Sequence, residues 1–150
     1  MASLHLTRRG AAAPAEEITL AAFRDGVRPE AGRFALVIPN TEDVRGLGEA
    51  TALFAAAILQ FPDFKDGRAY SQARLLRERL GFAGEIVARG EVLPDQALFM
   101  ARAGFTTLEI GERDPAPYEA ALRAYSVFYQ PGADAALTAH ARRARRREAA

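Results

Sequence analysis

The 150-residue chain contains no cysteine and no tryptophan, and it has only two histidines, one near each end. Without a thiolate the protein can form no disulfide, hold no cysteine-ligated iron–sulfur cluster and use no cysteine nucleophile. Because His5 and His140 both lie in terminal regions, a His-based metal site and a Ser-His-Asp triad are also hard to build. We therefore expect no metal, and acid–base chemistry falls to Asp, Glu, Lys65, Tyr and Arg.

Signatures of membrane insertion and of nucleotide cofactors are missing too. No apolar run approaches the roughly 20 residues needed to span a bilayer, and the N-terminal region lacks the apolar segment of a signal peptide. We therefore expect a cytoplasmic protein that does not enter a membrane. No Gly-x-Gly-x-x-Gly opens a helix after a strand, and no Gly-x-x-x-x-Gly-Lys-Ser/Thr is present. The sequence thus indicates no cofactor.

Charge is balanced over the whole chain but not along it. The net charge is +1, from 20 basic and 19 acidic residues. The last nine residues hold five arginines and one glutamate, which leaves 15 basic and 18 acidic residues, a net charge of −3, in the rest of the chain. With 49 % hydrophobic and 26 % charged residues, the chain has the composition of one soluble domain.

Apolar runs alternate with helix-forming segments along most of the chain. Strands are expected at Phe34–Ile38, Ala56–Phe61, Glu85–Ala88 and Thr106–Ile110, with shorter ones at Ile18–Phe23 and Ser126–Tyr129. Helices are expected at Thr41–Phe54, Arg68–Leu80, Pro94–Gly104 and Tyr118–Tyr125. Repeating strand–helix units predict an α/β fold with a mainly parallel sheet. Four or five units leave two arrangements, a half-barrel-like (TIM-barrel-like) layer or an open sheet, and residues 101–110 look like barrel enzymes, which favours the first.

The chain divides into three parts. Residues 1–16 are expected to be a flexible leader, residues 17–132 a single α/β domain, and residues 133–150 a basic C-terminal tail. The arginines between Arg142 and Arg147 could contact nucleic acid, but no aromatic residue is interleaved with them and no recognition module surrounds them. The pattern favours a solvated helix most and a nucleic-acid site least. Weak electrostatic binding to an acidic partner ranks between these two interpretations.

The most informative segment is Phe61–Arg79, where a strand end, a polar turn and a cationic helix follow one another. One helix face is apolar and suits packing on a sheet, and the others carry Arg68, Arg74, Arg77 and Arg79. Guanidiniums and Tyr70 near a helix N-terminus favour an anionic ligand or an acidic partner. A solvated helix with Glu78 as a counter-charge explains the same pattern.

The same segment resembles the signature of a bacterial family of unknown function, domain-of-unknown-function family 934. The match from Phe61 to Arg79 continues as Gly81–Glu85, a second block is Gly90–Gln96 with Glu91 where the family more often has Asp, and a third is Ala103–Phe105. The resemblance covers about residues 34–129. Members tend to be encoded beside the sulfite reductase hemoprotein, so the resemblance implies a role in sulfite reduction. It assigns no known reaction to these residues.

In both sheet arrangements, ligands gather at the carboxyl ends of the strands. The candidate catalytic residues there are Asp66 and Glu91, which can supply acid–base chemistry. The candidate anion-binding residues, for a carboxylate, phosphate or sulfur oxyanion, are Arg68, Tyr70, Arg74 and Arg89. The structural alternative is that Asp66 caps the following helix and that Arg89 pairs with Glu91 across neighbouring loops.

Two functions remain open, and with them the question of whether the protein is an enzyme. The first is an accessory protein of assimilatory sulfite reduction that binds the reductase or a related redox protein, since a chain without cysteine cannot hold the redox centre through thiolates. The second is a small barrel-like enzyme acting on an anionic metabolite. A homodimer is also expected, because a partial barrel leaves an edge and an apolar face uncovered; its expected contact is helix Pro94–Gly104, which carries Phe99.

Overall fold

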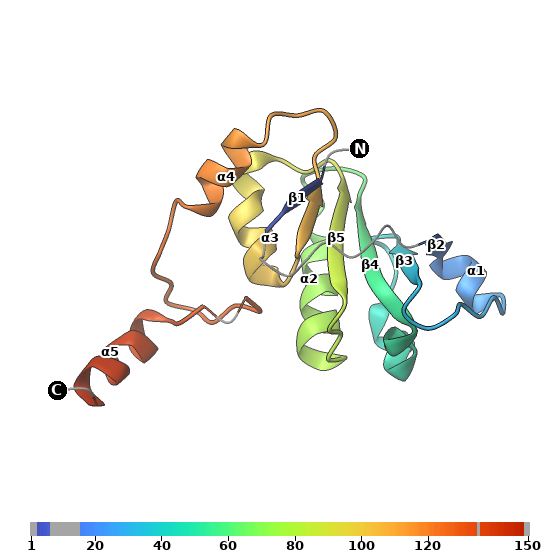
Figure 1. The fold of residues 1–150 in the computed structure, drawn as a ribbon, viewed down its shortest axis with the longest axis horizontal. Helices are drawn as coiled ribbons and strands as arrows, with labels where there is room; N and C mark the ends of the chain where they lie inside the picture. The colour runs from blue at the N-terminus through green and yellow to red at the C-terminus, as the bar shows by residue number, and fades with distance from the viewer. Residues whose placement is uncertain (1–2, 7–15, 135, 149–150) are drawn as a thin grey trace.

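A computed structural model describes residues 3–6, 16–134 and 136–148 of the chain. Figure 1 shows one sheet with helices packed against it. The strands, in the spatial order β1-β6-β5-β4-β3-β2, are β1 (Ser3–His5), β6 (Thr107–Glu109), β5 (Glu85–Gly90), β4 (Phe54–Phe61), β3 (Phe34–Ile38) and β2 (Glu16–Thr19). Strands β2 to β6 are parallel, and β1 pairs antiparallel with β6. The predicted α/β fold is confirmed, and its sheet is open and not closed into a barrel.

The inner strands are buried because almost every side chain on them is apolar. Strand β3 has the predicted bounds, and β4 begins two residues earlier than predicted, at Phe54. Both strands are buried on their two faces, which is typical of the middle of a parallel sheet. Val37 of β3 lies opposite Ile58 of β4 on one of these faces.

Helices follow the strands as the alternation predicts. They are α1 (Leu20–Arg24), η1 (Val44–Leu53), α2 (Arg68–Arg74), η2 (Leu75–Arg79), η3 (Pro94–Gln96), α3 (Ala97–Ala103), α4 (Ala116–Leu122) and α5 (Ala139–Glu148). The helix predicted from Arg68 is α2 continued by the π-helical turn η2. The helix predicted from Pro94 is η3 plus α3, which ends at Gly104 in the left-handed conformation. Segment η1 is a 3-10 helix broken at Gly48, where the sequence predicted a continuous helix.

Two predicted strands differ from the structure. The one predicted at Ile18–Phe23 ends at Thr19, because the Thr19 hydroxyl accepts a hydrogen bond of 3.1 Å from Ala22 N and caps α1. The one predicted at Ser126–Tyr129 is wrong, since this segment makes only a single bridge, between Phe128 and Thr138. It could not extend the sheet beyond β6, because β1 already pairs there.

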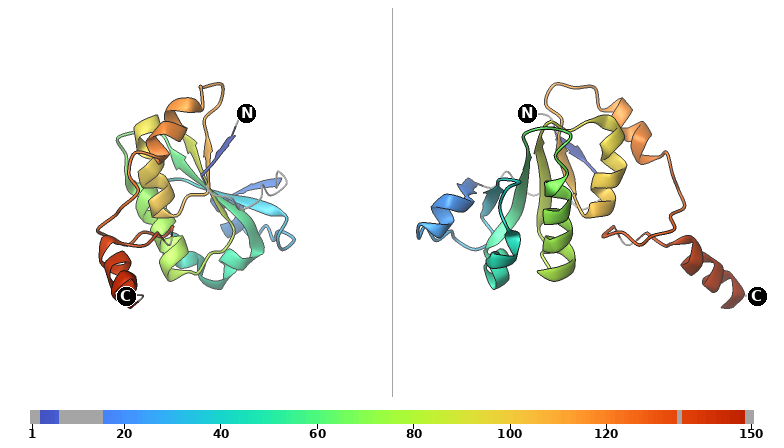
Figure 2. Two further views of the ribbon diagram at one scale, coloured as in Figure 1. Left: turned by 60° about the vertical axis from the view of Figure 1, so that its left-hand side comes forward. Right: turned by 180° about the vertical axis from the view of Figure 1, so that it is seen from behind.

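Within the described residues, the helices other than α5 lie on one face of the sheet. Right-handed crossovers between neighbouring parallel strands in chain order place them there. The main core joins strand residues such as Ile86 to helix residues such as Ala73 and Met100. The opposite face holds a small apolar cluster made of strand residues alone, Ala35, Val37, Ala56, Ile58 and Val87. Figure 2 shows α2 and α3 next to each other on the covered face.

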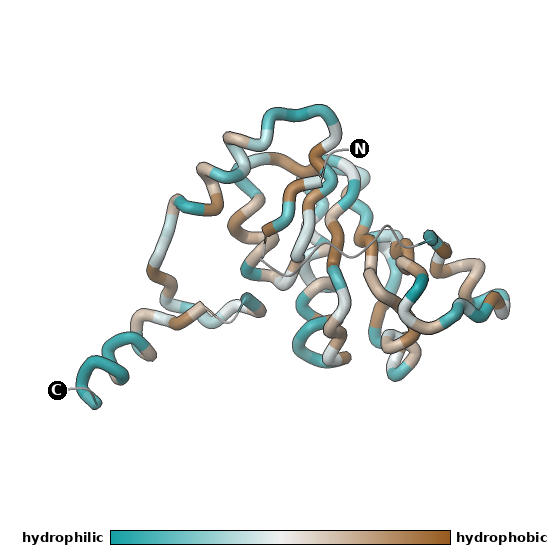
Figure 3. Tube along the Cα trace, in the orientation of Figure 1, coloured by the Kyte–Doolittle hydropathy of each residue, from teal (hydrophilic) through white to brown (hydrophobic). Residues whose placement is uncertain are grey.

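Both predicted terminal regions contain secondary structure. Ser3–His5, within the predicted leader, forms β1, while residues 1–2 and 7–15 of that leader lie outside the described residues. In the predicted tail, α5 has no buried residue and projects away from the sheet (Figure 1); residues 135, 149 and 150 lie outside the description. Figure 3 shows that α5 is hydrophilic, in contrast to the hydrophobic strands. None of the described helices combines the length and the apolar content needed to cross a bilayer.

Candidate functional site

The turn between β4 and α2 places Asp66 beside Arg68. The Arg68 guanidinium donates three hydrogen bonds to the Asp66 carboxylate, from Nε to Oδ1 at 3.0 Å, from Nε to Oδ2 at 3.1 Å and from Nη2 to Oδ2 at 2.5 Å. The Arg68 backbone N–H also donates to Oδ1 at 3.2 Å. The side-chain bonds from Arg68, followed by the backbone bond, lower the pKa of Asp66 to about 2. A carboxylate held in this ionised form is a weak base and a poor proton donor near neutral pH. Asp66 therefore holds the turn before α2 through the backbone and side chain of Arg68, whereas the N-cap position that the structural alternative gave to Asp66 is occupied by Gly67, which makes no side-chain capping bond.

Glu91 also holds this turn. Its Oε2 accepts a hydrogen bond of 3.4 Å from Phe64 N, and the nearby Gln96 donates one of 2.8 Å from Nε2 to Phe64 O. The turn after β4 is thus tied to the loop after β5 through both backbone groups of one residue. The predicted pairing of Glu91 with Arg89 is wrong, because Arg89 binds two other carboxylates.

Arg89 links strands from distant parts of the sequence. From β5 its guanidinium donates hydrogen bonds of 2.6 and 2.8 Å to Glu109 on β6, and of 2.7 and 2.8 Å to Glu17 on β2. Alternation along the strands puts all three side chains on the face opposite the helices. The hydrogen bonds with Glu17 and Glu109 raise the pKa of Arg89, and the bond to Arg89 lowers the pKa of Glu17. One cation shared by two carboxylates leaves a net negative charge, so an anion at Arg89 would have to displace one of them.

Tyr70 and Arg74 face a different part of the molecule from Arg68. The Tyr70 ring packs edge-on against Phe61 and Phe105, with ring centroids 5.5 and 6.1 Å apart. Burial, and then the charge of Asp95, raise the pKa of Tyr70 to about 12. The structure therefore distributes the four predicted anion-binding residues over three places, with Arg68 at the start of α2, Arg89 on the open sheet face, and Tyr70 and Arg74 between α2 and α3.

A small pocket of about 220 Å³ lies at the carboxyl ends of β3, β4 and β5. It is lined by Asn40, Gln60, Phe61, Pro62, Arg89 and Gly90. The side chain of Asn40 is buried, and its Nδ2 makes no hydrogen bond within the described residues. This pocket is where the fold predicts a ligand, and Arg89 is the only predicted site residue that lines it.

A larger groove of about 460 Å³ separates α2 and α3 from the segment that precedes α5. We call it the aromatic groove, and it is lined by Tyr70, Arg74, Phe99, Arg102, Ala103, Phe128, Tyr129, Gln130, Pro131 and Gly132. Phe99 and Tyr129 are 62 % and 84 % exposed. Sequence reasoning had singled out Phe99 but treated Phe128 and Tyr129 as part of a strand.

Arg102, which sequence reasoning missed, holds one wall of the aromatic groove in place. Its guanidinium carbon lies 3.8 Å from the ring centroid of Phe128. It also donates a hydrogen bond of 2.5 Å from Nη2 to Gln130 O and forms an ion pair of 3.2 Å with Asp134. The carbonyl of Arg102 accepts a further bond of 2.8 Å from Ala133 N. These contacts join α3 to residues 26 to 32 positions later, which no local pattern signals.

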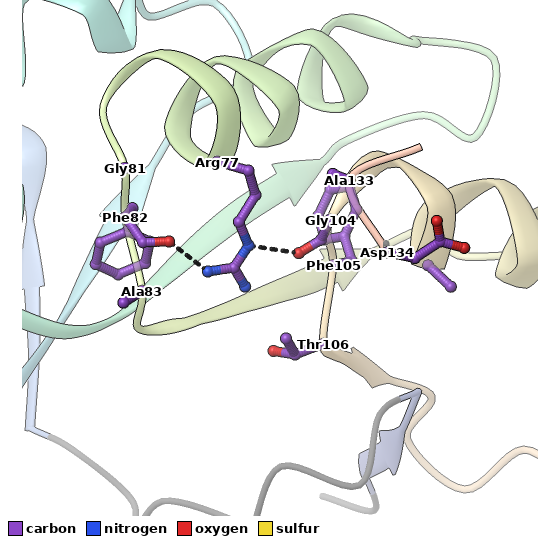
Figure 4. Close-up of a pocket in the computed structure, with 10 residues that line it drawn as sticks. Arg77, Gly81, Phe82, Ala83, Gly104, Phe105, Thr106, Ala133 and Asp134 are labelled. Atoms are coloured by element: carbon purple, nitrogen blue, oxygen red, sulfur yellow. Dashed lines mark hydrogen bonds between the residues drawn. The ribbon is translucent and has the colours of Figure 1, made fainter. Parts of the chain in front are cut away.

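A third hollow, also of about 460 Å³, surrounds Arg77 at the amino ends of β5 and β6 (Figure 4). The Arg77 side chain donates from Nε to Gly104 O at 3.0 Å and from Nη1 to Phe82 O and Gly84 O, both at 2.6 Å. It thereby binds carbonyl groups that follow the ends of η2 and α3, where a cation also complements the helix dipoles. Arg77 is committed to this structural role.

The fold and its surface define an α/β protein with an open, mainly parallel sheet and an exposed aromatic groove. Within the described residues, no group of three or more Asp, Glu or His side chains is placed to hold a metal ion. A family described as "Bacterial protein of unknown function (DUF934)" matches residues 35–140, more than half of the chain, so the protein belongs to this family. No curated protein and no solved structure matches the chain.

Proposed function

We propose that the protein is an accessory protein of assimilatory sulfite reduction and that it acts by binding the reductase or its electron-delivery partner through the aromatic groove. The observation that carries this proposal is the grouping of exposed apolar side chains. Six large hydrophobic side chains are exposed among the described residues, and two of them, Phe99 and Tyr129, line the aromatic groove together with the ring of Phe128. Clustered exposed aromatic residues are characteristic of protein interfaces.

The process itself is proposed from the family resemblance, which connects members with the sulfite reductase hemoprotein. The absence of cysteine is consistent with a binding role, because this chain cannot supply thiolate ligands to a redox cluster. The groove also offers no strongly activated group. Its Tyr70 hydroxyl has a pKa raised to about 12, so it is a weaker acid than an ordinary tyrosine and is not activated as a nucleophile.

The test is direct binding to the purified sulfite reductase hemoprotein and, separately, to its electron-delivery partner, measured by co-elution and by isothermal titration. We expect one of the two to bind the wild-type chain, and we expect Phe99→Ser and Tyr129→Ser each to weaken binding by tenfold or more, on the order expected for an aromatic interface anchor. Phe64→Ser is the matched control, because Phe64 is exposed on the turn after β4, away from the groove. Absence of binding to both proteins would reject the proposal.

A second candidate function, a small enzyme acting on an anionic metabolite, is supported by the pocket at the carboxyl ends of β3 to β5. Thermal shift with sulfite, sulfate, phosphate and small carboxylates tests it. A specific ligand at 100 times its dissociation constant adds about 2.7 kcal/mol to the free energy of unfolding. Gln60→Ala should abolish such a shift, because Gln60 lines the pocket. A shift that survives this substitution, or no shift with any of these anions, would speak against the enzyme.

A further inference from the structure

We propose that the segment of the partner that docks here is acidic and amphipathic, with apolar side chains in the aromatic groove and carboxylates against α5. This inference rests on the proposed function in taking the groove as a protein-binding surface. It adds the chemistry of the partner, which follows from how charge is distributed around the groove.

The arginines inside the aromatic groove are already neutralised. Arg74 donates to Glu78 at 2.8 and 3.1 Å, and Arg102 pairs with Asp134. The walls that remain are rings and small side chains, including Phe99, Ala103 and Tyr129. The groove therefore selects for apolar side chains and attracts no anion by itself.

Most arginines of α5, in contrast, are not neutralised by a carboxylate of the described residues. Arg142 donates one hydrogen bond of 2.7 Å to Ser126 O. The side chains of the other four, Arg143, Arg145, Arg146 and Arg147, make no hydrogen bond or ion pair within the described part of the chain. A helix of ten residues presents this charge over about 15 Å. Uncompensated guanidiniums at this density favour carboxylates.

The helix and the groove form one continuous surface. Ala139 N at the start of α5 donates a hydrogen bond of 2.7 Å to the carbonyl of Phe128, whose side chain lines the groove. The bond from Arg142 to Ser126 O attaches the first turn of α5 to the same segment. Figures 1 and 3 show the hydrophilic α5 leading away from this segment, beyond α3. An occupant that enters the groove can therefore continue along α5.

Other occupants fit this surface less well. A nucleic acid strand would find uncompensated cations for its phosphates on α5, but its bases in the groove would lie near the carboxylates of Asp134 and Glu78. A membrane surface requires an apolar helix face, and α5 is Ala- and Arg-rich with no large apolar residue. A symmetric contact between two copies through this surface would bring two basic helices together.

The experiment uses the full chain and a fluorescein-labelled peptide with Phe and two Leu in its first half and five Glu in its second. Fluorescence anisotropy should show binding that weakens with added salt, because the carboxylate contacts are screened. We use two control peptides, one with Ala in place of the apolar residues and one with Lys in place of Glu. Each should bind with an affinity at least about tenfold lower. An oligo-dT strand of equal charge should also bind more weakly than the acidic peptide.

Two protein variants localise the effect. Replacement of Arg143, Arg145, Arg146 and Arg147 by Gln should weaken binding of the acidic peptide about tenfold or more. The control replaces four exposed arginines at the other edge of the sheet by Gln, namely Arg24, Arg28, Arg33 and Arg45. It removes the same charge from the whole molecule and should leave the affinity nearly unchanged.

Equal loss of affinity in both variants would overturn the inference, because it would reduce the effect to net charge. Tighter binding of the oligonucleotide than of the peptide would assign the surface to nucleic acid. A mass above 16.2 kDa in light scattering that Phe99→Ser reduces to the monomer value would assign it to a second copy. If the reductase or its partner binds but the α5 variant leaves that binding unchanged, the acidic-segment inference fails while the proposed function stands.

Discussion

The guanidinium carbon of Arg102 lies 3.8 Å from the centroid of the Phe128 ring, and this contact attaches the segment before α5 to α3. The Arg102 side chain is only 13 % exposed, although it carries a full charge. Its hydrogen bond to Gln130 O and its ion pair with Asp134 satisfy that charge. The position of α5 beside the groove therefore depends on one arginine of a different helix.

Replacing Arg102 by Ala should release this segment. Loss of a desolvated cation–π contact and of charge-assisted hydrogen bonds should lower the free energy of unfolding by about 2 kcal/mol. Urea denaturation measures this loss, and hydrogen exchange should show faster exchange at Ala133, whose N–H bonds the Arg102 carbonyl. The control Arg123→Ala, which breaks an exposed pair with Glu119, should cost less than about 0.5 kcal/mol. Equal costs would show that the contact does not hold the segment.

Stability should decrease in acid partly through Glu17. Its pKa in the folded state is lowered by the hydrogen bond from Arg89, so its contribution to stability is full above the unfolded value near 4.3 and is lost as the pH falls through the folded value. Arg89→Gln should remove this contribution and flatten the decrease in stability below about pH 5. Denaturation at several pH values measures it. An unchanged pH profile would contradict a role for the pair in folding.

The carboxyl of Asp66 should titrate with a pKa of about 2, which NMR of its side-chain carbon can follow. Arg68→Gln should return the pKa towards about 3.9, the value of an unperturbed Asp, because the side-chain hydrogen bonds from Arg68 are the main cause of the shift. The stabilising effect of this ionised carboxylate is present above the unfolded value and lost as the pH falls towards 2. A pKa that does not move in the variant would place the cause elsewhere.

Gly104→Ala should destabilise the protein for two reasons. Gly104 has a φ of 107°, which side-chain-bearing residues rarely adopt, and an added Cβ would lie 2.6 Å from Cγ of Arg77. We expect a loss of more than about 1 kcal/mol in the free energy of unfolding. Gly46→Ala is the control, since Gly46 has open space around it and lies within η1; there the change should be small and could be stabilising. Similar effects at both positions would argue against the close contact with Arg77.

The sequence alone was sufficient for the elements whose cause is local. The continuous apolar run Phe34–Ile38 can only be buried on both faces, and Pro94 and Gly104 delimit a helix by their own backbone preferences. The alternation of such elements determined an α/β fold with a mainly parallel sheet. The turn from Asp63 to Arg68 was also predictable, because Asp66 and Gly67 have the chemistry of a cap and a turn.

Tertiary structure alone decided which charged side chains form ion pairs and which surface is left exposed. Arg89 meets Glu17 across 72 positions of sequence, and Arg68 and Tyr70 point to different places although two residues apart, because a helix turns about 100° per residue. Ser126–Tyr129 has the composition of a strand but forms no part of the sheet, because β1 occupies the edge beside β6. Pairing at a sheet edge is a competition between distant segments, and no property of either segment by itself determines its outcome.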